Sequence, residues 1–250
     1  MALFKSGNPA LSEKTFKGFQ NVDNDSEVMT LQGTVNKTAL LLLLCIVPAM
    51  FTWVLYTLTY DFMIILPFWG IATVGGIVIT IIMINKKELA PTLAPIYAVI
   101  QGLFLGGLSA ALDARFPGIA LQALVLTLGI CGVMLLIYKL KIIKPTENFK
   151  LIIASATGGI ALFYLISIGM SFFGVQIPLV NENSTGGIIF SLFVVVLAAM
   201  NLVVDFDFIE QGANSRAPKY MEWYGAFGLM VTIIWLYVEI LRLLAKSRRR

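Results

Sequence analysis

The sequence contains no histidine and few charged residues. Lysine, arginine, aspartate and glutamate make up 13% of the 250 residues, whereas 58% are hydrophobic and the mean hydropathy is +0.88. A soluble globular protein needs about a quarter of its residues charged to solvate its surface. We therefore expect most of the surface to face a lipid bilayer. The missing histidines exclude the common zinc sites, histidine-ligated haem and catalysis by Ser-His-Asp or Cys-His groups.

Cysteine is scarce as well. Cys45 and Cys131 each lie within an apolar run, which is typical of small buried side chains rather than of a disulfide or a metal site. The two residues therefore say nothing about the redox compartment.

Long apolar runs dominate the remaining sequence. A helix rises about 1.5 Å per residue and the hydrocarbon core is about 30 Å thick, so roughly 20 apolar residues cross it. The sequence predicts an all-α integral membrane protein with a polar leader (1–37), a membrane domain (38–245) and a short basic tail (246–250). The seven predicted transmembrane helices are Thr38–Leu58, Phe62–Ile84, Leu93–Leu112, Gly118–Tyr138, Leu151–Phe173, Thr185–Val204 and Gly225–Ala245.

The basic residues predict the orientation of these helices. Twelve of the 18 lie in the leader or in the loops that follow the second, fourth and sixth spans, and the other loops contain only Arg115. Because basic residues accumulate on the cytoplasmic side, the N-terminus is expected in the cytoplasm. Seven crossings would then place the basic tail outside, against the rule. Either the upstream charges dominate, which we favour, or one apolar segment turns back within the membrane.

Three acidic residues stand together at the end of the sixth apolar run. They are Asp205, Asp207 and Glu210. On a helix Asp205 and Asp207 point in nearly opposite directions, so all three cannot line one surface. We expect one aspartate to face the interior and the others to face the cytoplasmic interface.

A further acid, Glu239, lies inside the seventh apolar run. Apolar residues flank it for a turn or more on both sides. It could pair with Arg242 three residues later, but an ionisable group at this depth is costly and is expected to face a protein or water-filled interior.

Two such acids would form a proton-sensitive pair if they approached each other. Two carboxylates in a poorly solvated site cannot easily both ionise, so one would hold a proton, and calcium could replace that proton. Straight helices would separate Asp205 and Glu239 by roughly 20 Å in depth. Their pairing requires that the last helix enters the bilayer late, near Gly225, or that the sixth helix continues beyond Asp205.

The sequence patterns around both acidic clusters resemble those of a known protein family. The pattern Asp-Phe-X-X-Ile at Asp205–Ile209 and the pattern Leu-Tyr-X-acid-Ile-Leu-X-Leu at Leu236–Leu243 resemble the Bax inhibitor-1 (TMBIM/YccA-like) family. The leader motif at 7–12 and the segments 201–212 and 221–224 resemble its bacterial branch, which has an extended polar N-terminus.

The resemblance implies a fold in which six helices surround the seventh. It also implies a pH-sensitive calcium leak in the bacterial plasma membrane, with Asp205 and Glu239 as the proton-sensing gate and the calcium ligands. Two features depart from the commoner family pattern: the last helix carries a glutamate instead of an aspartate, and the loop between the acids is longer. Residues with auxiliary roles would be Asp207, Glu210, Arg242 and Gln101, the last of which stands where many relatives carry an acid.

Gly102 and Gly106 form a small-X-X-X-small face, which lets helix backbones approach closely, and we favour packing within one monomer. The predicted protein is a monomer and not an enzyme. It has no resident cofactor and no nucleic-acid partner, and it interacts with membrane lipid, calcium and protons.

Two alternative functions remain open. The acids could relay protons in a proton-coupled transporter of a small solute, or the leader could dock partners in stress response and protein quality control. An intramembrane aspartyl protease is disfavoured because no span contains a Gly-X-Gly-Asp motif.

Overall fold

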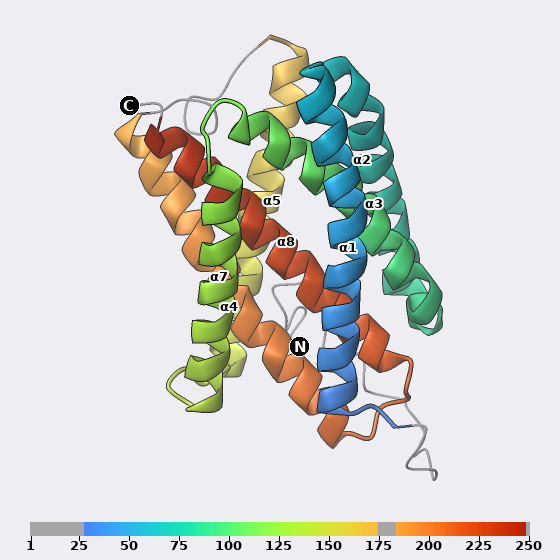
Figure 1. Ribbon diagram of the computed structural model, residues 1–250. Coiled ribbons are helices and arrows are strands. Elements are labelled where there is room, and N and C mark those ends of the chain that lie inside the picture. The colour runs from blue at the N-terminus through green and yellow to red at the C-terminus, as the bar shows by residue number, and fades with distance from the viewer. Residues whose placement is uncertain (1–27, 175–183, 249–250) are drawn as a thin grey trace. The chain divides into compact units, whose positions relative to one another are not determined.

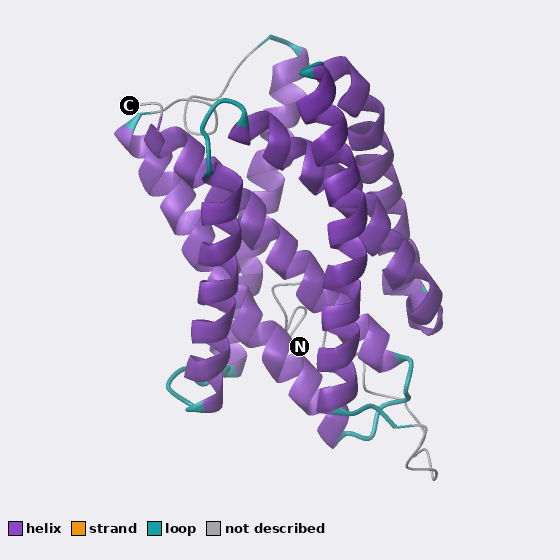
Figure 2. Ribbon diagram, in the orientation of Figure 1, coloured by secondary structure: helices purple, strands orange, loops and turns teal. Residues whose placement is uncertain are grey.

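The computed structural model describes residues 28–174 and 184–248. In these residues the chain forms seven long α-helices and the short 3-10 helix η3 (Lys87–Leu89), and no strand (Figure 2). Each long helix is long and apolar enough to cross a membrane, which confirms the predicted all-α fold with seven spans. The helices labelled in Figure 1 are α1 (Leu31–Thr59), α2 (Phe62–Asn85), α3 (Ala90–Asp113), α4 (Ile119–Lys139), α5 (Glu147–Phe172), α7 (Thr185–Asn214) and α8 (Met221–Arg248).

Local capping signals explain where several helices begin. The Thr30 hydroxyl accepts a hydrogen bond from the Gly33 N–H at 2.9 Å and starts α1. The Asp61 carboxylate accepts one from the Met63 N–H at 2.8 Å and starts α2. Such side-chain oxygens satisfy N–H groups of the first turn that have no partner within the helix.

Several helix ends differ from the predicted ones, and three of them bear on the acidic residues. α1 begins at Leu31 rather than Thr38, α7 continues to Asn214 rather than Val204, and α8 begins at Met221 rather than Gly225. Hydropathy marks only the part of a helix that crosses hydrocarbon, whereas the helical backbone continues through polar residues into the interface. The sixth helix therefore continues beyond Asp205, which was one of the two conditions for pairing of the acids, whereas entry of the last helix into the bilayer near Gly225 stays a prediction.

The described residues form two compact units. The first unit consists of Leu121–Phe206, which holds most of α4, all of α5 and most of α7, together with the part of α8 from Thr232 on. The second unit holds α1, α2 and α3 together with Asp207–Val231, which includes the end of α7 and the start of α8.

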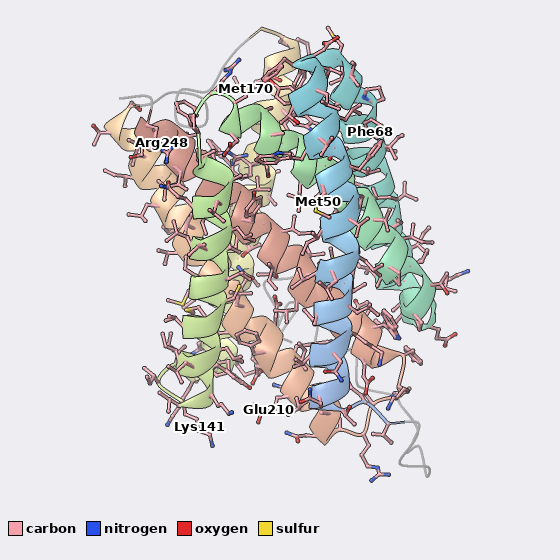
Figure 3. All side chains as sticks on the ribbon, viewed as in Figure 1. Met50, Phe68, Lys141, Met170, Glu210 and Arg248 are labelled. Carbon is pink, nitrogen blue, oxygen red and sulfur yellow. The ribbon has the colours of Figure 1, made fainter. Side chains whose placement is uncertain are left out.

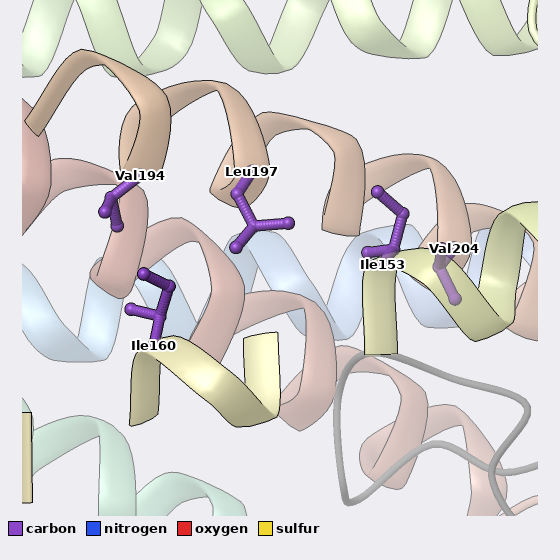
Figure 4. Close-up of a cluster of buried hydrophobic side chains, with 5 residues drawn as sticks. All are labelled: Ile153, Ile160, Val194, Leu197 and Val204. Carbon is purple, nitrogen blue, oxygen red and sulfur yellow. The ribbon is translucent and has the colours of Figure 1, made fainter. Parts of the chain in front are cut away.

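The core of the first unit lies between α5 and α7. Ile153 and Ile160 of α5 pack with three buried residues of α7, Val194, Leu197 and Val204 (Figure 4). Partly buried aromatic residues, among them Tyr164 and Trp235, pack against this cluster. The polar residues of α5, α7 and α8 described below therefore lie next to an apolar core.

In the second unit, α3 packs closely on α1 through its glycines. A Cβ atom added at Gly102 would overlap the Cys45 carbonyl oxygen, and one added at Gly106 would overlap the Ala49 carbonyl oxygen. The predicted small-residue face is therefore an intramolecular packing surface, as we favoured. Tyr97 of α3 also contacts Phe227 of α8 edge to face, with 4.8 Å between the ring centroids.

Helix α8 packs within both units, as expected for a helix that others surround. In the first unit it bonds to α5 through Tyr164 and to α7 through Asp205. In the second unit it contacts α3 through Phe227 and α1 through Glu222.

Two contacts join helix ends, one within each unit. In the second unit, the Met29 N–H donates to the Ala217 carbonyl at 2.7 Å, so the start of α1 lies beside the loop between α7 and α8. In the first unit, Lys246 at the end of α8 donates to the Gly187 carbonyl at the start of α7. Each of the seven long helices is long and apolar enough to cross a membrane, and seven full crossings stay the preferred prediction.

Large apolar side chains cover the outer surfaces of the helices. Met50 of α1 and Met170 of α5 are exposed examples (Figure 3). Exposed apolar groups of this number would be unfavourable in water, and they suit contact with lipid.

Candidate functional site

The buried polar residues of α7 lie on one face of the helix. Asn201 and Asp205, one turn apart, are 1% and 0% exposed. Asp207 is half-buried and accepts a hydrogen bond from Gln211 Nε2 at 2.6 Å, and Glu210 is exposed. The aspartate that faces the interior is therefore Asp205, a choice that the sequence left open. Glu210, labelled in Figure 3, projects near the end of α7.

Asp205 is bonded to α8 by a hydroxyl group. Thr232, which is 3% exposed, donates a hydrogen bond from Oγ1 to Oδ2 of Asp205. One turn away, Asn201 Nδ2 donates to Thr157 Oγ1 of α5 at 2.8 Å and to the Leu197 carbonyl at 2.9 Å. Polar contacts thus join α7 to both α5 and α8 at this level.

Glu239 forms a separate site with a tyrosine and an arginine. The Tyr164 hydroxyl donates to its two carboxylate oxygens, at 3.0 and 3.2 Å. Arg242 Nη1 donates to the same oxygens at 2.9 and 3.1 Å and to the Tyr164 hydroxyl at 2.6 Å. The guanidinium carbon also lies 4.8 Å from the centroid of the Tyr164 ring. The charge of Glu239, which is 1% exposed, is thus compensated within the membrane.

The expected contact between Asp205 and Glu239 is not made. The partners of Glu239 are Tyr164 and Arg242. Thr232, the partner of Asp205, precedes Glu239 by seven residues, which corresponds to about 10 Å along a helix. Antiparallel packing sets this offset, because Asp205 lies near the C-terminal end of α7 and Glu239 near the C-terminal end of α8, at opposite ends of the pair.

The structure does not assemble a metal site from these acids. Throughout residues 28–174 and 184–248, no group of three or more His, Cys, Asp or Glu side chains could hold a metal ion. Asp205 and Glu239 each offer one carboxylate at a separate level.

Gln101 belongs to the second unit, whereas Asp205 and Glu239 belong to the first. It lines a groove of about 390 Å³ between α2 and α3, together with Tyr97, Phe104 and small residues of α2. Gly76 makes room for its amide, because a Cβ atom there would overlap Gln101 Nε2. Its auxiliary role stays a prediction.

A third buried acid, Glu222, was missed by the sequence reasoning. It is 0% exposed and accepts hydrogen bonds from the Thr30 N–H at 2.9 Å and from the Thr30 hydroxyl at 2.8 Å. Lys37 forms an ion pair with its other carboxylate oxygen, and Lys219 Nζ lies 3.6 Å away. Glu222 lies outside the predicted last span, Gly225–Ala245, and only the proximity of Thr30 and Lys37 could have shown that it is enclosed.

Glu222 links the start of α8 to the start of α1. We call its contacts with Thr30, Lys37 and Lys219 the Glu222 clasp. Lys37 Nζ also lies 5.5 Å from the centroid of the Trp223 ring. Gly33 is required at this contact, since a Cβ atom would overlap the Glu222 carboxylate. The carboxylate thereby satisfies an N–H group at the beginning of α1, where the helix dipole favours negative charge.

A comparison with known families identifies the chain. The family model described as Bax inhibitor 1 like matches residues 8–249. The chain belongs to the Bax inhibitor 1 like family. This confirms the resemblance drawn from the two acidic clusters, and it agrees with a multi-pass membrane protein. No curated protein and no solved structure matches the chain. Asp205 and Glu239, the two residues carried over from the Bax inhibitor-1 motifs, are both buried within membrane-spanning helices.

Proposed function

We propose that this Bax inhibitor-like protein is a pH-sensitive calcium leak, in which protonation of Asp205 and Glu239 controls the passage of the ion. The observation that carries the proposal is the complete burial of both carboxylates inside membrane-spanning helices. An ionisable group costs on the order of 2.5 to 3.5 kcal/mol at the centre of a membrane helix, so its presence points to function.

The two acids act at separate levels in this proposal. Deprotonated Asp205 offers a carboxylate beside the Thr232 hydroxyl, and calcium binds to hard oxygen ligands of this kind. Conduction requires several weak sites rather than one tight site, because the ion must leave as readily as it enters. Single carboxylates on successive levels of the path meet this requirement better than a shared cage would.

Glu239 would regulate passage through its ion pair. Protonation removes the negative charge that Arg242 faces, and it weakens the contact that holds α5 and α8 together through Tyr164. In this proposal the contact that holds the gate is the one among Glu239, Arg242 and Tyr164, rather than a hydrogen bond between two acids.

The proposed setting is a bacterial plasma membrane with the N-terminus in the cytoplasm. Lys37 and Lys219 surround Glu222, and Lys87 Nζ lies 5.9 Å from the Tyr224 ring centroid, so basic residues gather where α1 begins. The positive-inside rule favours the cytoplasm for such a face. The protein would act as a monomer without enzymatic activity or a resident cofactor.

Calcium entry into liposomes tests the proposal. Purified protein is reconstituted, and entry is followed with an enclosed calcium dye at several pH values between about 5 and 8. We expect a flux above that of empty liposomes, with a pH profile that changes in Asp205→Asn and in Glu239→Gln. Glu88→Gln, an exposed acid in the turn between α2 and α3, is the matched control. A flux equal to that of empty liposomes would refute the leak.

A further inference from the structure

The groove between α2 and α3 of the second unit has the size of a ligand site. Its volume is about 390 Å³, within the range of roughly 300 to 1,000 Å³ that small-molecule sites occupy. Ala72 and Ile77 of α2 and Phe104 of α3 give it apolar walls, and none of the residues that line it is charged. Ile77 is also exposed, so the groove opens on the outer surface of the helices. A ligand held there would be uncharged, because a charge away from water needs a partner.

Two of the four polar side chains that line the groove already have partners. The Thr73 hydroxyl donates to the Trp69 carbonyl at 2.8 Å, and the Thr80 hydroxyl donates to the Gly76 carbonyl at 2.7 Å. These are the usual bonds of a helical threonine to the carbonyl four residues earlier. Neither hydroxyl therefore needs a hydrogen bond from a ligand.

The other two polar side chains of the groove are Tyr97 and Gln101, one turn apart on α3. Neither makes a hydrogen bond within the part of the chain that the structure describes. Tyr97 is only 6% exposed, and its ring packs edge to face on Phe227. Gln101 Nε2 lies against the backbone of Gly76. Packing thus holds a hydroxyl and an amide at the groove, and buried polar groups left without a bond indicate a missing partner.

The depth of this pair limits what the partner can be. Gln101 follows Ala90, the first residue of α3, by eleven residues and precedes Asp113, the last, by twelve. Both helix ends are therefore about 17 to 18 Å away along the axis. Water is absent from the hydrocarbon, and phospholipid headgroups begin about 15 Å from its centre. An acyl chain in the groove would leave both polar groups unbonded, so the partner must bring a hydrogen-bond acceptor to the centre of the membrane.

We propose that this groove binds an uncharged prenyl lipid with a carbonyl-bearing head, which is the chemistry of a membrane quinone. The Tyr97 hydroxyl and the Gln101 amide donate hydrogen bonds to the carbonyl oxygens of the head. The apolar tail follows α2 from Ala72 toward Ile81, a length of about 14 Å. Binding of such a lipid goes beyond the proposed calcium leak and does not depend on it.

Infrared spectroscopy of a bound quinone tests the inference. The full-length protein is placed in nanodiscs of phosphatidylcholine and phosphatidylglycerol, and a benzoquinone with a short prenyl tail and isotope-labelled carbonyls is titrated in. We expect saturable binding of one quinone per chain. The carbonyl band of the bound quinone should lie at a lower wavenumber than in empty nanodiscs, because a donated hydrogen bond weakens the C=O bond.

Substitution of the two donors tests the site. Tyr97→Phe and Gln101→Leu should each weaken binding about fivefold to tenfold, the effect of one lost hydrogen bond, and the double variant should lose the band shift. Tyr97→Phe keeps the ring that packs on Phe227, so it provides the test if the leucine variant does not fold. Thr80→Val is the matched control in the same groove, because the Thr80 hydroxyl already donates to Gly76, and it should bind with native affinity.

Four results would overturn the inference. They are the absence of saturable binding, a native affinity and band shift in the double variant, and equally tight binding of a prenyl benzene without carbonyls, which would indicate an acyl chain as the natural occupant. The fourth is a disulfide between two copies of the Ile77→Cys variant in nanodiscs, which would show that a second copy covers the groove. Calcium flux enters none of these measurements, so the proposed leak and the lipid site can each fail while the other stands.

Discussion

Thr232 of α8 donates its hydroxyl hydrogen bond to the Asp205 carboxylate of α7. This contact fixes the register of the two helices, and it places Glu239 about 10 Å further along α8. The two acids that the sequence suggested as a pair are thus two separate sites, one bonded to a hydroxyl and the other to an arginine and a tyrosine.

Because Asp205 and Glu239 form separate sites, their substitutions should change the free energy of unfolding independently. Residues more than about 7–10 Å apart without shared partners contribute additively to unfolding, within roughly 0.5 kcal/mol. The destabilisation of the Asp205→Asn, Glu239→Gln double variant should therefore equal the sum of the two single values. Reversible unfolding in detergent or bicelles measures all three. A coupling energy above about 1 kcal/mol would indicate a direct bond between the acids.

The Tyr164 hydroxyl should stabilise the Glu239 site measurably. Tyr164→Phe removes a donor to a buried carboxylate, and a hydrogen bond to a charged group contributes about 1.5 to 3 kcal/mol. We expect a lower free energy of unfolding by about that amount. Tyr56→Phe is the control, because the Tyr56 hydroxyl of α1 makes no hydrogen bond within the part of the chain that the structure describes. Equal effects of the two substitutions would contradict the assigned contact.

The clasp at Glu222 should contribute more than any surface ion pair. Lys37→Met leaves a fully buried carboxylate without its closest cation, and removing one partner of a buried pair costs about 3 to 5 kcal/mol. Since Lys219 and Thr30 still contact Glu222, the lower end of that range is expected. Lys144→Met, at an exposed position in the loop before α5, should have almost no effect. Thermal unfolding of both variants decides the question, and a similar loss in the two would refute the clasp.

Because α3 packs closely on α1, alanine at Gly106 should destabilise the protein, whereas alanine at Gly129 of α4 should not. In Gly106→Ala the new Cβ would overlap the Ala49 carbonyl oxygen, so the helices must separate at a cost of about 1 to 3 kcal/mol. In Gly129→Ala on α4 nothing lies within 4 Å of the new Cβ, and the higher helix propensity of alanine should stabilise the protein slightly. If the two variants melt at the same temperature, α3 does not pack on α1 through Gly106.

Hydropathy predicted all seven helices because a chain in lipid must satisfy its backbone hydrogen bonds within each segment. It could not predict where every helix ends, since helical structure continues through polar residues beyond the predicted end of α7 and beyond both predicted ends of α8. For this reason Asp205 was expected at a helix end, although it lies nine residues before the last residue of α7.

The hydrogen-bond partners of the acids could not be predicted from the sequence either. Residues on one helix face can be read from their spacing, as Glu239 and Arg242 were, but the register between helices is set by tertiary packing. Tyr164 lies 75 residues from Glu239 along the chain, and Thr30 lies 192 residues from Glu222. No spacing rule connects residues so far apart, so the Tyr164 contact and the whole Glu222 clasp became visible only in the structure.

The pH profile of calcium entry into liposomes tests the central claim most directly, with the native protein, Asp205→Asn, Glu239→Gln and the double variant measured side by side. Two separate proton-sensitive sites predict that each single variant retains part of the native pH response and that the double variant retains none. A double variant with the native pH profile, or a native protein with no flux above that of empty liposomes, would contradict the account.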